Sequence, residues 1–428
     1  MTNTSIDVQE LRKRIAEKAK AEPRHRFWGL YTHVWKLNVL EAAYRLAKKN
    51  GGAPGSDAVT FKEIEAGGVE HLLDELSREL REKTYCPLPS RLVKIPKDGG
   101  TRTLKIPAIR DRIVQGALRL ICEPIFESDF QPGSYGYRPG RSAHQALARV
   151  REGVHRNLNQ VINLDLAGFY DNVRHDVLLT KLAVRIQDPD ILGLCKKILK
   201  ASGKRGLPQG SVIGPLWANV FLNDVDRMLE QAQKVTMDGA YECIRYTRWA
   251  DDLVVLVSNH PTKSHWAPKV ERRLREEFGK LGLSINEAKS STVDFSRGQA
   301  FNFLGYRFRR VRHRSKPGKT MILARPLRKR RTRFLRDIRM VLRRHLHHPV
   351  AWVIRELINP RVRGWVQFFR WGNSSPDLSF VRWQLEKKIR KFASRQRPKG
   401  CGCAWSKWSH DTLYKEWRLY SNYRVLGW

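Results

Sequence analysis

Two adjacent carboxylates, Asp251 and Asp252, precede the apolar run at residues 253–257. Like charges at close range repel each other, and a bound cation that neutralises them removes that cost. A solvated Asp-Asp turn between two strands would place the same residues equally well. Taken alone, the pair therefore predicts either an exposed turn or a metal site.

Asp165 favours the metal site. It lies within the apolar sequence VINLDL, which predicts a strand over residues 160–167, and central strands disfavour Asp. A surface-facing position remains an alternative, because Leu164 and Leu166 would point to the opposite face. If Asp165 and Asp251 lie on neighbouring strands, their oxygens suit Mg²⁺. Two ions about 4 Å apart would then activate a 3′-hydroxyl and stabilise a leaving pyrophosphate, and phosphoryl transfer needs little beyond positioning and charge.

The elements that must position these aspartates follow from hydrophobic periodicity and turn residues. Ala250-Asp251-Asp252 is predicted to be the turn between two strands within residues 243–258, and Asp98-Gly-Gly100 the turn of a hairpin. The region after residue 308 is predicted to be mostly helical, with interruptions at Pro349, Pro360 and Pro376. Further helices are predicted over residues 7–50, 68–84, 108–128, 142–157, the segment that ends near 185, 206–230 and 265–282, with strands near 290–308.

The charge of the chain predicts a polyanionic partner. The 428 residues include 81 Lys and Arg against 42 Asp and Glu, for a net charge of +39, and a field of that sign attracts nucleic acid. Residues 306–428 hold 33 Lys and Arg but only 6 Asp and Glu, which indicates a long contact with phosphates. A small ribosomal or chromatin protein is a poor match for this length and for 13 Trp.

The six cysteines are scattered, which fits a reducing compartment better than a disulfide framework. Cys401-Gly-Cys403 lacks a second pair at zinc-finger spacing. No apolar run reaches the roughly 18 residues of a membrane span, and the polar N-terminus has no signal-peptide pattern. We therefore expect a cytoplasmic protein without a membrane partner, associated with the nucleoid when it is on DNA.

Ordered blocks over nearly the whole chain resemble the group II intron reverse transcriptases, the intron-encoded maturases. Each block alone is modest support, but their order and spacing together are highly specific. From residue 25 onwards the similar blocks are RFWGLYTHVWKLNVLEAAYRLAKKNGGAPGSDAVTF, VKIPKDGGTRTLKIPAIRDRIVQGAL, FESDFQPGSYGYRPGRSAHQAL, NLDLAGFYDNVRHDVLL, GLPQGSVIGPLWANVFLNDVD, RYTRWADDLVVLV, GLSINEAKS and FNFLGYRF.

The resemblance implies a role for each matching residue. Asp165, Asp251 and Asp252 match the family's metal-binding triad, in which Asp252 either ligates or only orients and neutralises, and the Leu166 carbonyl is a further candidate ligand. Lys97 and Arg102 match residues that hold the incoming triphosphate, although an ordinary charged hairpin is the alternative. Gln209 would pack over the nucleotide, with Pro208 and Gly210 shaping its turn; a plain helix-entry turn is the alternative.

The family also implies an aromatic gate at Tyr170, which would clash with a ribose 2′-hydroxyl and so select dNTPs. A core aromatic is the alternative there, and Phe169 is the better candidate for the core. Lys289 would be the general acid that protonates pyrophosphate, unless it is a solvated lysine at a strand start. The residues of FLGY at 303–306 would support the primer strand or simply belong to a sheet core. Trp249 stands where the family usually has Tyr. This difference keeps an aromatic ring, loses the hydroxyl and leaves every metal ligand in place.

The last region resembles the family's thumb, or maturase, domain. In RVRGWVQFFRWGNS the aromatics alternate with arginines, and we expect the aromatics to be helix core and the arginines to contact RNA. No Cys/His cluster of the HNH endonuclease type is present, so DNA cleavage by this chain is not expected. In this last region the basic residues expected to contact RNA are Arg325, Arg328, Lys329, Arg330, Arg331, Arg333, Arg336, Arg361, Arg363 and Arg370.

The combined prediction is an α+β fold: a right-hand polymerase whose fingers and palm contain an antiparallel sheet and helices, followed by an all-α thumb/maturase (X) domain. The expected domains are an N-terminal extension (1–60), fingers and palm (61–308) and thumb (309–428). The expected function is RNA-directed DNA synthesis with two Mg²⁺ ions, or Mn²⁺ in their place, coupled to splicing and retrotransposition of an intron RNA.

The expected partners are the intron RNA template, a DNA or RNA primer and dNTPs, and the sequence carries no prediction of oligomeric state. Two alternatives remain open. One is a domesticated group II-like reverse transcriptase in phage defence, CRISPR adaptation or DNA repair, which the neighbouring genes would distinguish. The other is a non-catalytic RNA-binding splicing factor, against which the three aspartates argue.

Overall fold

A computed structural model describes residues 7–97, 100–237, 239, 241–263, 265–313, 317–396 and 408–426. The chain forms two compact units. The first unit contains residues 1–146 and 162–291, and the second contains residues 147–161 and 292–428. The turn predicted at Asp98 and the pair Cys401 and Cys403 lie outside the described residues.

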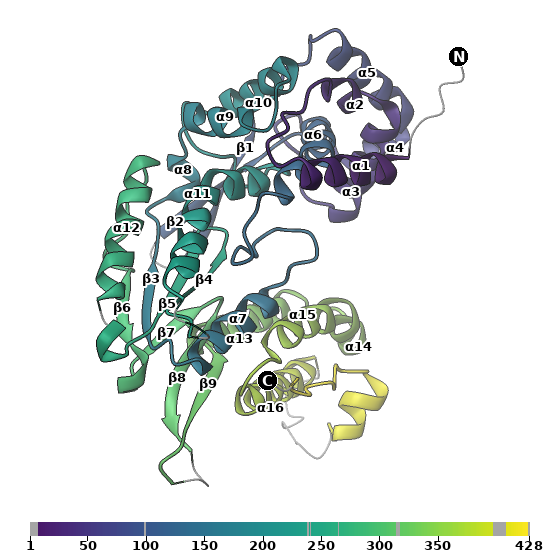
Figure 1. The fold of residues 1–428 in the computed structure, drawn as a ribbon. Helices are drawn as coiled ribbons and strands as arrows, with labels where there is room; N and C mark the ends of the chain where they lie inside the picture. The colour runs from purple at the N-terminus through teal and green to yellow at the C-terminus, as the bar shows by residue number, and fades with distance from the viewer. Residues whose placement is uncertain are drawn as a thin grey trace. The chain divides into compact units, whose positions relative to one another are not determined.

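The first unit combines a helical cluster with the two-stranded β1-β2 hairpin and a separate sheet that holds β3, β4 and β5 (Figure 1). Its helices are α1 (Val8–Ala21), α2 (Tyr31–Val34), α3 (Leu37–Asn50), α4 (Phe61–Ala66), α5 (Val69–Arg81), α6 (Ile109–Glu127), α8 (Phe169–Asn172), α9 (His175–Ala183), α10 (Pro189–Ala201), α11 (Gly214–Val235) and α12 (Trp266–Lys280). Its strands are β1 (Arg91–Lys97), β2 (Gly100–Ile106), β3 (Gln160–Leu164), whose first two residues belong to the second unit, β4 (Ile244–Trp249) and β5 (Asp252–Val257).

Local sequence signals explain several of these boundaries. Thr60 and Glu63 form a reciprocal capping box at the start of α4. Asp188 caps α10 ahead of Pro189, a helix that was not predicted. The strands β1 and β2 pair antiparallel from Arg91↔Ile106 to Lys97↔Gly100, as predicted for the hairpin.

The sheet of the first unit holds the predicted Asp-Asp turn. β4 and β5 pair antiparallel, and β5 lies between β4 and β3. Every residue of β5 after Asp252 is buried, and α11 packs on β4. One continuous core contains the buried hydrophobic residues of this sheet and those of α3, α6, α9, α10, α11 and α12. The two strands on either side of the turn are therefore packed into the core of the unit.

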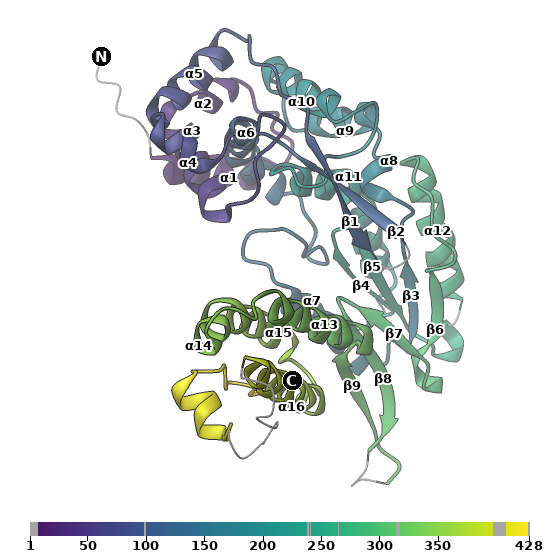
Figure 2. The same ribbon diagram turned by 180° about the vertical axis from the view of Figure 1, so that it is seen from behind.

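The second unit contains a three-stranded sheet and a group of helices (Figure 2). The sheet has the order β7-β8-β9. The elements, together with a π-helical turn at Val353–Ile358 and another at Thr412–Glu416, are α7 (Ala143–His155), which begins in the first unit, β6 (Ser291–Asp294), β7 (Ala300–Phe303), β8 (Tyr306–Arg312), β9 (Thr320–Pro326), α13 (Arg328–Arg344), α14 (Val350–Trp352), α15 (Asn359–Phe369) and α16 (Ser375–Arg395).

Two predictions for the C-terminal region need correction. The region after residue 308 is not all helical, because β8 continues to Arg312 and pairs with β9 along its whole length. Pro360 does not interrupt the helix; it lies in the first turn of α15, directly after the π-helical turn. A proline is tolerated there because the first N–H groups of a helix have no partner to lose.

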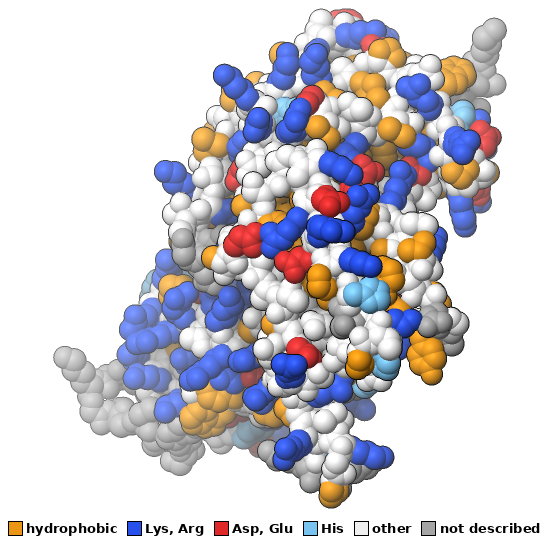
Figure 3. Space-filling view, turned by 60° about the vertical axis from the view of Figure 1, so that its left-hand side comes forward, with side chains coloured by type: hydrophobic (Ala, Val, Ile, Leu, Met, Phe, Trp, Pro, Cys, Tyr) orange, Lys and Arg blue, Asp and Glu red, His pale blue; other side chains and the backbone are white. Residues whose placement is uncertain are grey.

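No helix within the described ranges is both long and apolar enough to cross a bilayer. The domain boundaries expected at residues 60 and 308 remain predictions. In the space-filling view of Figure 3, Lys and Arg side chains cover far more of the visible face than Asp and Glu do, in agreement with the net charge of +39.

Candidate active site

The β4–β5 hairpin presents Asp251 at a tight turn. Trp249 pairs with Asp252 across the hairpin, and Ala250 has a φ of +56°, in the left-handed region that non-glycine residues seldom adopt. Both aspartates are half-buried. A strained residue at a turn between two buried strands indicates that the surrounding structure holds the turn in place.

Arg248 provides much of that support, and sequence reasoning missed it. Its side chain is 1% exposed and donates Nη1–H to the Ala250 carbonyl (2.8 Å), directly behind the turn. The guanidinium also donates from Nε to Asp226 Oδ1 of α11 (2.8 Å) and to Asn219 and Ser134. Burial alone would lower the pKa of Arg248, but the Asp226 carboxylate raises it, so the guanidinium stays charged.

A glycine-rich segment lies against the same strand. The N–H of Tyr135 donates to the Arg248 carbonyl, and the Arg248 N–H donates to the Gly133 carbonyl, both at 2.9 Å. A Cβ on Gly136 would lie 2.4 Å from the Ala250 nitrogen. Only glycine therefore allows this segment to approach the Asp-Asp turn so closely.

Asp165 lies one residue beyond the end of β3, not within the strand as predicted. Its backbone is fixed on both sides: its N–H donates to Ser290 Oγ (3.1 Å), and its carbonyl accepts from the Asn286 N–H (2.8 Å). The side chain of Lys289 reaches Asp165 Oδ2 at 3.7 Å. Leu166 is buried and forms a bridge with Ile285. The Lys289 segment and the Asp165 segment are thus held together, as a shared function requires.

Tyr170 lies near the Asp-Asp turn. Its ring is half-buried, whereas Phe169 is 2% exposed and belongs to the core, as predicted. The pKa of Tyr170 is raised by burial, then by Tyr137 and Asp251, against the opposing effects of Arg102 and Arg248. The Asp251 carboxylate is thus one of the charges that act on the Tyr170 hydroxyl. Tyr137, which the sequence did not single out, packs its ring 6.2 Å from that of Trp249.

Gln209 joins the Tyr170 segment to the β1–β2 hairpin. Its side-chain oxygen accepts a hydrogen bond from Arg102, and its carbonyl accepts from the Lys105 N–H at 2.9 Å. The Leu207 N–H donates to the Tyr170 carbonyl at 2.6 Å. The structure therefore brings Arg102, Gln209 and Tyr170 together. The side chain of Lys97 lies outside what is described.

The donor chemistry at this site suits a hard divalent cation, since such ions prefer carboxylate and carbonyl oxygens. Asp165 follows β3 and Asp251 precedes β5, and these strands are neighbours in the sheet. As the side chains lie in the described residues, however, no three His, Cys, Asp or Glu residues are gathered tightly enough to hold a metal ion. Residue types and strand order fit the ion, and binding would require the carboxylates to converge.

The FLGY sequence proves to be a hairpin in the second unit. Phe303 and Tyr306 are 1% and 0% exposed, and the Tyr306 hydroxyl donates to the Phe368 carbonyl at 2.8 Å. Leu304 and Gly305 form the turn with positive φ, the backbone shape that suits a two-residue hairpin. The two aromatics are sheet core, so any contact with a primer falls to the turn.

The basic residues predicted to contact RNA do not all have the same surroundings. Arg325 and Arg331 both bind Asp377, at 2.7 and 2.8 Å, and so have a structural role. Arg361 and Arg363 are exposed. The aromatics of RVRGWVQFFRWGNS are buried or half-buried, as expected for helix core.

Comparison with known families decides what this arrangement belongs to. Residues 95–308 match the reverse transcriptase (RNA-dependent DNA polymerase) family, and residues 331–420 match the group II intron, maturase-specific domain. The chain belongs to the reverse transcriptases. It is an RNA-directed DNA polymerase of the group II intron type, with the maturase domain C-terminal to the polymerase.

Individual relatives agree. Protein YkfC of Escherichia coli (strain K12) is 33% identical over 74% of this reverse transcriptase and 92% of its own length. Group II intron-encoded protein LtrA of Lactococcus lactis subsp. cremoris is 22% identical over 90% of this chain and 78% of LtrA.

Among solved structures, telomerase from Candida albicans in complex with a fragment of telomeric RNA is similar, with 12% identity over 81% of this chain and 70% of the telomerase and a TM-score of 0.41. Apo telomerase from Candida tropicalis without its C-terminal domain is 15% identical, with a TM-score of 0.40. The match covers 56% of this chain and 58% of the telomerase chain. These TM-scores add nothing to the assignment, which rests on the family matches.

Proposed function

We propose that Asp165, Asp251 and Asp252 form the catalytic centre at which this reverse transcriptase adds dNTPs to a primer on an RNA template. The observation that carries the proposal is the order of strands: β3, which Asp165 follows, is the direct neighbour of β5, which Asp252 begins. The effect of Asp251 on the pKa of Tyr170 supports it, because the ring proposed to select the substrate and the carboxylates must share one site.

Divalent ions such as Mg²⁺ are the cofactors proposed for this centre, since reverse transcriptases use divalent metals; when bound, they would supply positive charge at the attacking and leaving oxygens. Asp165 and Asp251 would hold them, with the Leu166 carbonyl as a further ligand, and Asp252 would hold or orient. Like charges at this turn are costly until a cation neutralises them.

The incoming nucleotide would be held by groups around Gln209. Arg102, whose side chain contacts Gln209, would bind the triphosphate together with Lys97, because guanidinium and ammonium groups donate charge-assisted hydrogen bonds to phosphate. Gln209 would pack over the base or sugar. Lys289, 3.7 Å from Asp165, would donate its proton to the leaving pyrophosphate.

The catalytic assignment is tested by extension of a DNA primer on an RNA template with Mg²⁺. Asp251→Asn should lower the rate of dNTP incorporation on the order of 10³-fold or more, as losses of essential groups do in other enzymes. Asp224→Asn is the matched control, because Asp224 is an exposed α11 carboxylate paired with Lys181. Equal dNTP incorporation by wild type and Asp251→Asn would refute the proposal that Asp251 belongs to the catalytic centre.

Tyr170 is proposed to exclude ribonucleotides through the bulk of its ring. Tyr170→Ala should therefore raise rNTP incorporation relative to dNTP by roughly tenfold or more, whereas Tyr170→Phe keeps the ring and should keep the selection. The ratio of kcat/KM for dGTP and GTP measures this. If Tyr170→Ala and Tyr170→Phe select sugars alike, the ring is only part of the core.

Lys289 is proposed as a general acid, a role that contributes about 10²–10⁴-fold to a rate. Lys289→Gln should slow single-turnover incorporation by that order without changing the KM for dNTP. Lys280→Gln is the control, because Lys280 is a similarly exposed lysine that pairs with Glu277. A rate for Lys289→Gln as high as that of the control would leave Lys289 as a solvated lysine next to Asp165.

We further propose that the maturase-specific domain binds an intron RNA and assists its splicing and mobility. The support is the match over residues 331–420 and the excess of Lys and Arg in residues 306–428. The measurement is splicing of the RNA encoded around the gene, with and without protein, at physiological salt. Unchanged splicing by a polymerase-active protein would favour a domesticated role.

A further inference from the structure

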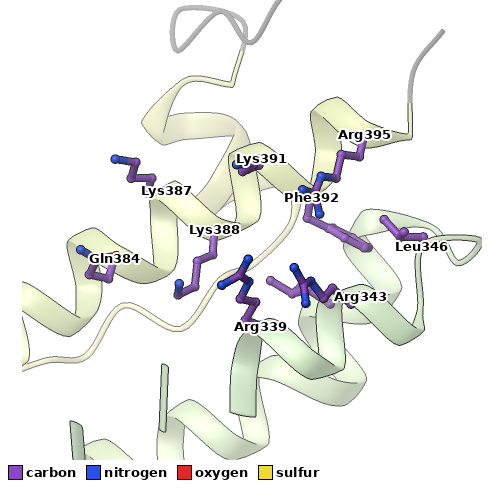
Figure 4. Close-up of a pocket in the computed structure, with 10 residues that line it drawn as sticks. Arg339, Arg343, Leu346, Gln384, Lys387, Lys388, Lys391, Phe392 and Arg395 are labelled. Atoms are coloured by element: carbon purple, nitrogen blue, oxygen red, sulfur yellow. The ribbon is translucent and has the colours of Figure 1, made fainter. Parts of the chain in front are cut away.

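A basic pocket lies between the C-terminal half of α13 and α16, within the second unit (Figure 4). Its volume is about 270 Å³, far above the roughly 10–15 Å³ that a cavity needs to hold one water molecule. The floor is apolar, because Leu342 and Phe392, 5% and 3% exposed, contribute the side chains there. The pocket is too large for a single small ion and is shaped by both helices.

Cations dominate the walls of the basic pocket. Figure 4 shows Lys388 of α16 and Arg339 and Arg343 of α13 pointing into the space between the helices. Lys388 is half-buried, and its pKa is lowered by burial and then by its neighbours Arg339, Lys387 and Lys391. The full set of lining cations is Arg339, Arg343, Lys387, Lys388, Lys391 and Arg395.

No carboxylate lines the basic pocket among the described residues. The nearest acidic residue along α16, Glu386, is occupied by Arg382 and Arg390, and none of the six lining cations forms an ion pair within the described part of the chain. The sequence of residues 397–407, which lie outside that part, contains no Asp or Glu. Within the described residues, therefore, no paired carboxylate neutralises the positive charge of the pocket.

This arrangement costs the helices stability. The pairs Arg339/Arg343 and Lys387/Lys391 lie four residues apart, where like charges on a helix repel. α12 shows the usual solution, because Arg272 and Arg273 each pair with a glutamate three or four residues further along. A cluster of cations whose mutual repulsion is not relieved by carboxylates is suited to binding a negatively charged ligand.

We propose that the basic pocket binds the phosphodiester backbone of RNA, with successive phosphates held by cations of both helices and a nucleoside over Leu342 and Phe392. Arginines from α13 offer forked donors that match phosphate oxygens, and lysines from α16 add point charges. The apolar floor suits a sugar or base edge better than it suits the carboxylates of an acidic peptide. The inference rests on the proposed RNA binding of the maturase-specific domain and assigns a site to it.

The test is equilibrium binding of a fluorescein-labelled 20-nucleotide oligouridylate to the full chain between about 50 and 300 mM salt. The pocket variant Arg343→Gln/Lys388→Gln/Lys391→Gln should bind at least tenfold more weakly at about 150 mM salt. Its slope of log affinity against log salt should fall by about two, since each phosphate contact on a single strand contributes about 0.7. The charge-matched control is Lys20→Gln/Lys49→Gln/Lys62→Gln, three exposed lysines of the first unit, which should stay within about twofold of wild type.

Three outcomes would overturn the proposal: wild-type affinity and slope in the pocket variant, equal loss in the pocket and control variants, or displacement of the RNA by polyglutamate at equal charge concentration. Restored binding in Arg343→Gln/Lys388→Arg/Lys391→Arg would support it, and a thermal unfolding transition of the pocket variant like that of wild type would show that the pocket variant is folded. Primer extension is measured separately on the same proteins. A wild-type protein that binds the RNA but incorporates no dNTP would refute the proposed polymerase centre and leave the pocket standing.

Discussion

The Asp-Asp turn and the basic pocket differ in whether their charged side chains have partners of opposite charge. Behind the turn, the fully buried Arg248 is bound by Asp226, Asn219, Ser134 and the Ala250 carbonyl. In the basic pocket, six cations line a cavity without a carboxylate among the described residues. In the first region paired charges fix the backbone of the turn, whereas in the second region the positive charges are left for a ligand to neutralise.

Removing Arg248 should produce the largest effect, because it would leave Asp226 buried without its cation. Arg248→Met is expected to lower the free energy of unfolding by about 3–5 kcal/mol and to abolish dNTP incorporation. Urea unfolding followed by circular dichroism would measure the first effect, and primer extension the second.

The double variant Arg248→Met/Asp226→Leu separates charge from geometry. Removing both charges should recover much of the lost stability, since a buried pair can often be replaced by apolar side chains. Activity should stay low, because the donor to the Ala250 carbonyl is still missing. A double variant as unstable as the single one would contradict this account of the pair.

Asp111 is a buried carboxylate of a third kind, because it is bound by neutral donors and, within the described ranges, forms no ion pair with an arginine as Asp226 does. Its pKa is raised to about 6 by burial, against the opposing hydrogen bonds from the Tyr85 hydroxyl and the Leu88 N–H. Its contribution to stability is therefore complete below about pH 4, where the unfolded chain is also protonated, and is lost as the pH rises through about 6.

The stability advantage of wild type over Asp111→Asn should accordingly shrink by on the order of 2 kcal/mol between pH 4.5 and pH 7.5. Chemical unfolding of both proteins at the two pH values measures it. An advantage that grows with pH would mean that Asp111 is ionised in the folded protein throughout this range.

Gly136 tests how closely the turn is held. Gly136→Ala would place a Cβ 2.4 Å from the Ala250 nitrogen, and such overpacking typically costs about 1–3 kcal/mol. Displacement of the Asp251 turn should lower incorporation as well. Gly193→Ala is the control: a Cβ there meets nothing within 4 Å, and a helix gains roughly 0.5–1 kcal/mol from the exchange. Equal activity of the two variants would show that the turn tolerates movement.

The smallest effect should come from the basic pocket. Lys388→Gln removes one of several mutually repelling charges, so the free energy of unfolding should stay unchanged or rise by a few tenths of a kcal/mol. Thermal unfolding in low salt measures this. A loss above about 1 kcal/mol would show that Lys388 has a structural partner, and the contrast with Arg248 would fail.

The sequence predicted those parts of the site that local pattern determines. Asp251 at a turn and Phe169 in the core follow from apolar runs and their breaks. Arg248 escaped prediction because its partners Asp226 and Asn219 lie on α11, more than twenty residues earlier, and only folding brings them together. A signal was present, since two arginines, Arg245 and Arg248, lie in a six-residue strand that also holds Ile244, Tyr246 and Trp249, and arginine is seldom fully buried unless it is paired.

The strand β9 was missed for a related reason. The segment TMILARP is flanked by basic residues, and its strand character depends on pairing with β8, which periodicity cannot reveal. The π-helical turn before Pro360 likewise depends on packing within the second unit. The roles of Lys97, Arg102 and Gln209 remain predictions, as do those of Tyr170 and Lys289, which the variants above address.

A double-mutant cycle between Asp165, which follows β3, and Asp251, which precedes β5, examines whether the two carboxylates form one catalytic centre. Single-turnover dNTP incorporation on an RNA template is compared for wild type, Asp165→Asn, Asp251→Asn and the double variant. Residues that act as one unit are strongly non-additive, so each single variant should already show nearly the full loss of the double variant. Losses that multiply, or a single variant with wild-type activity, would contradict a shared catalytic centre.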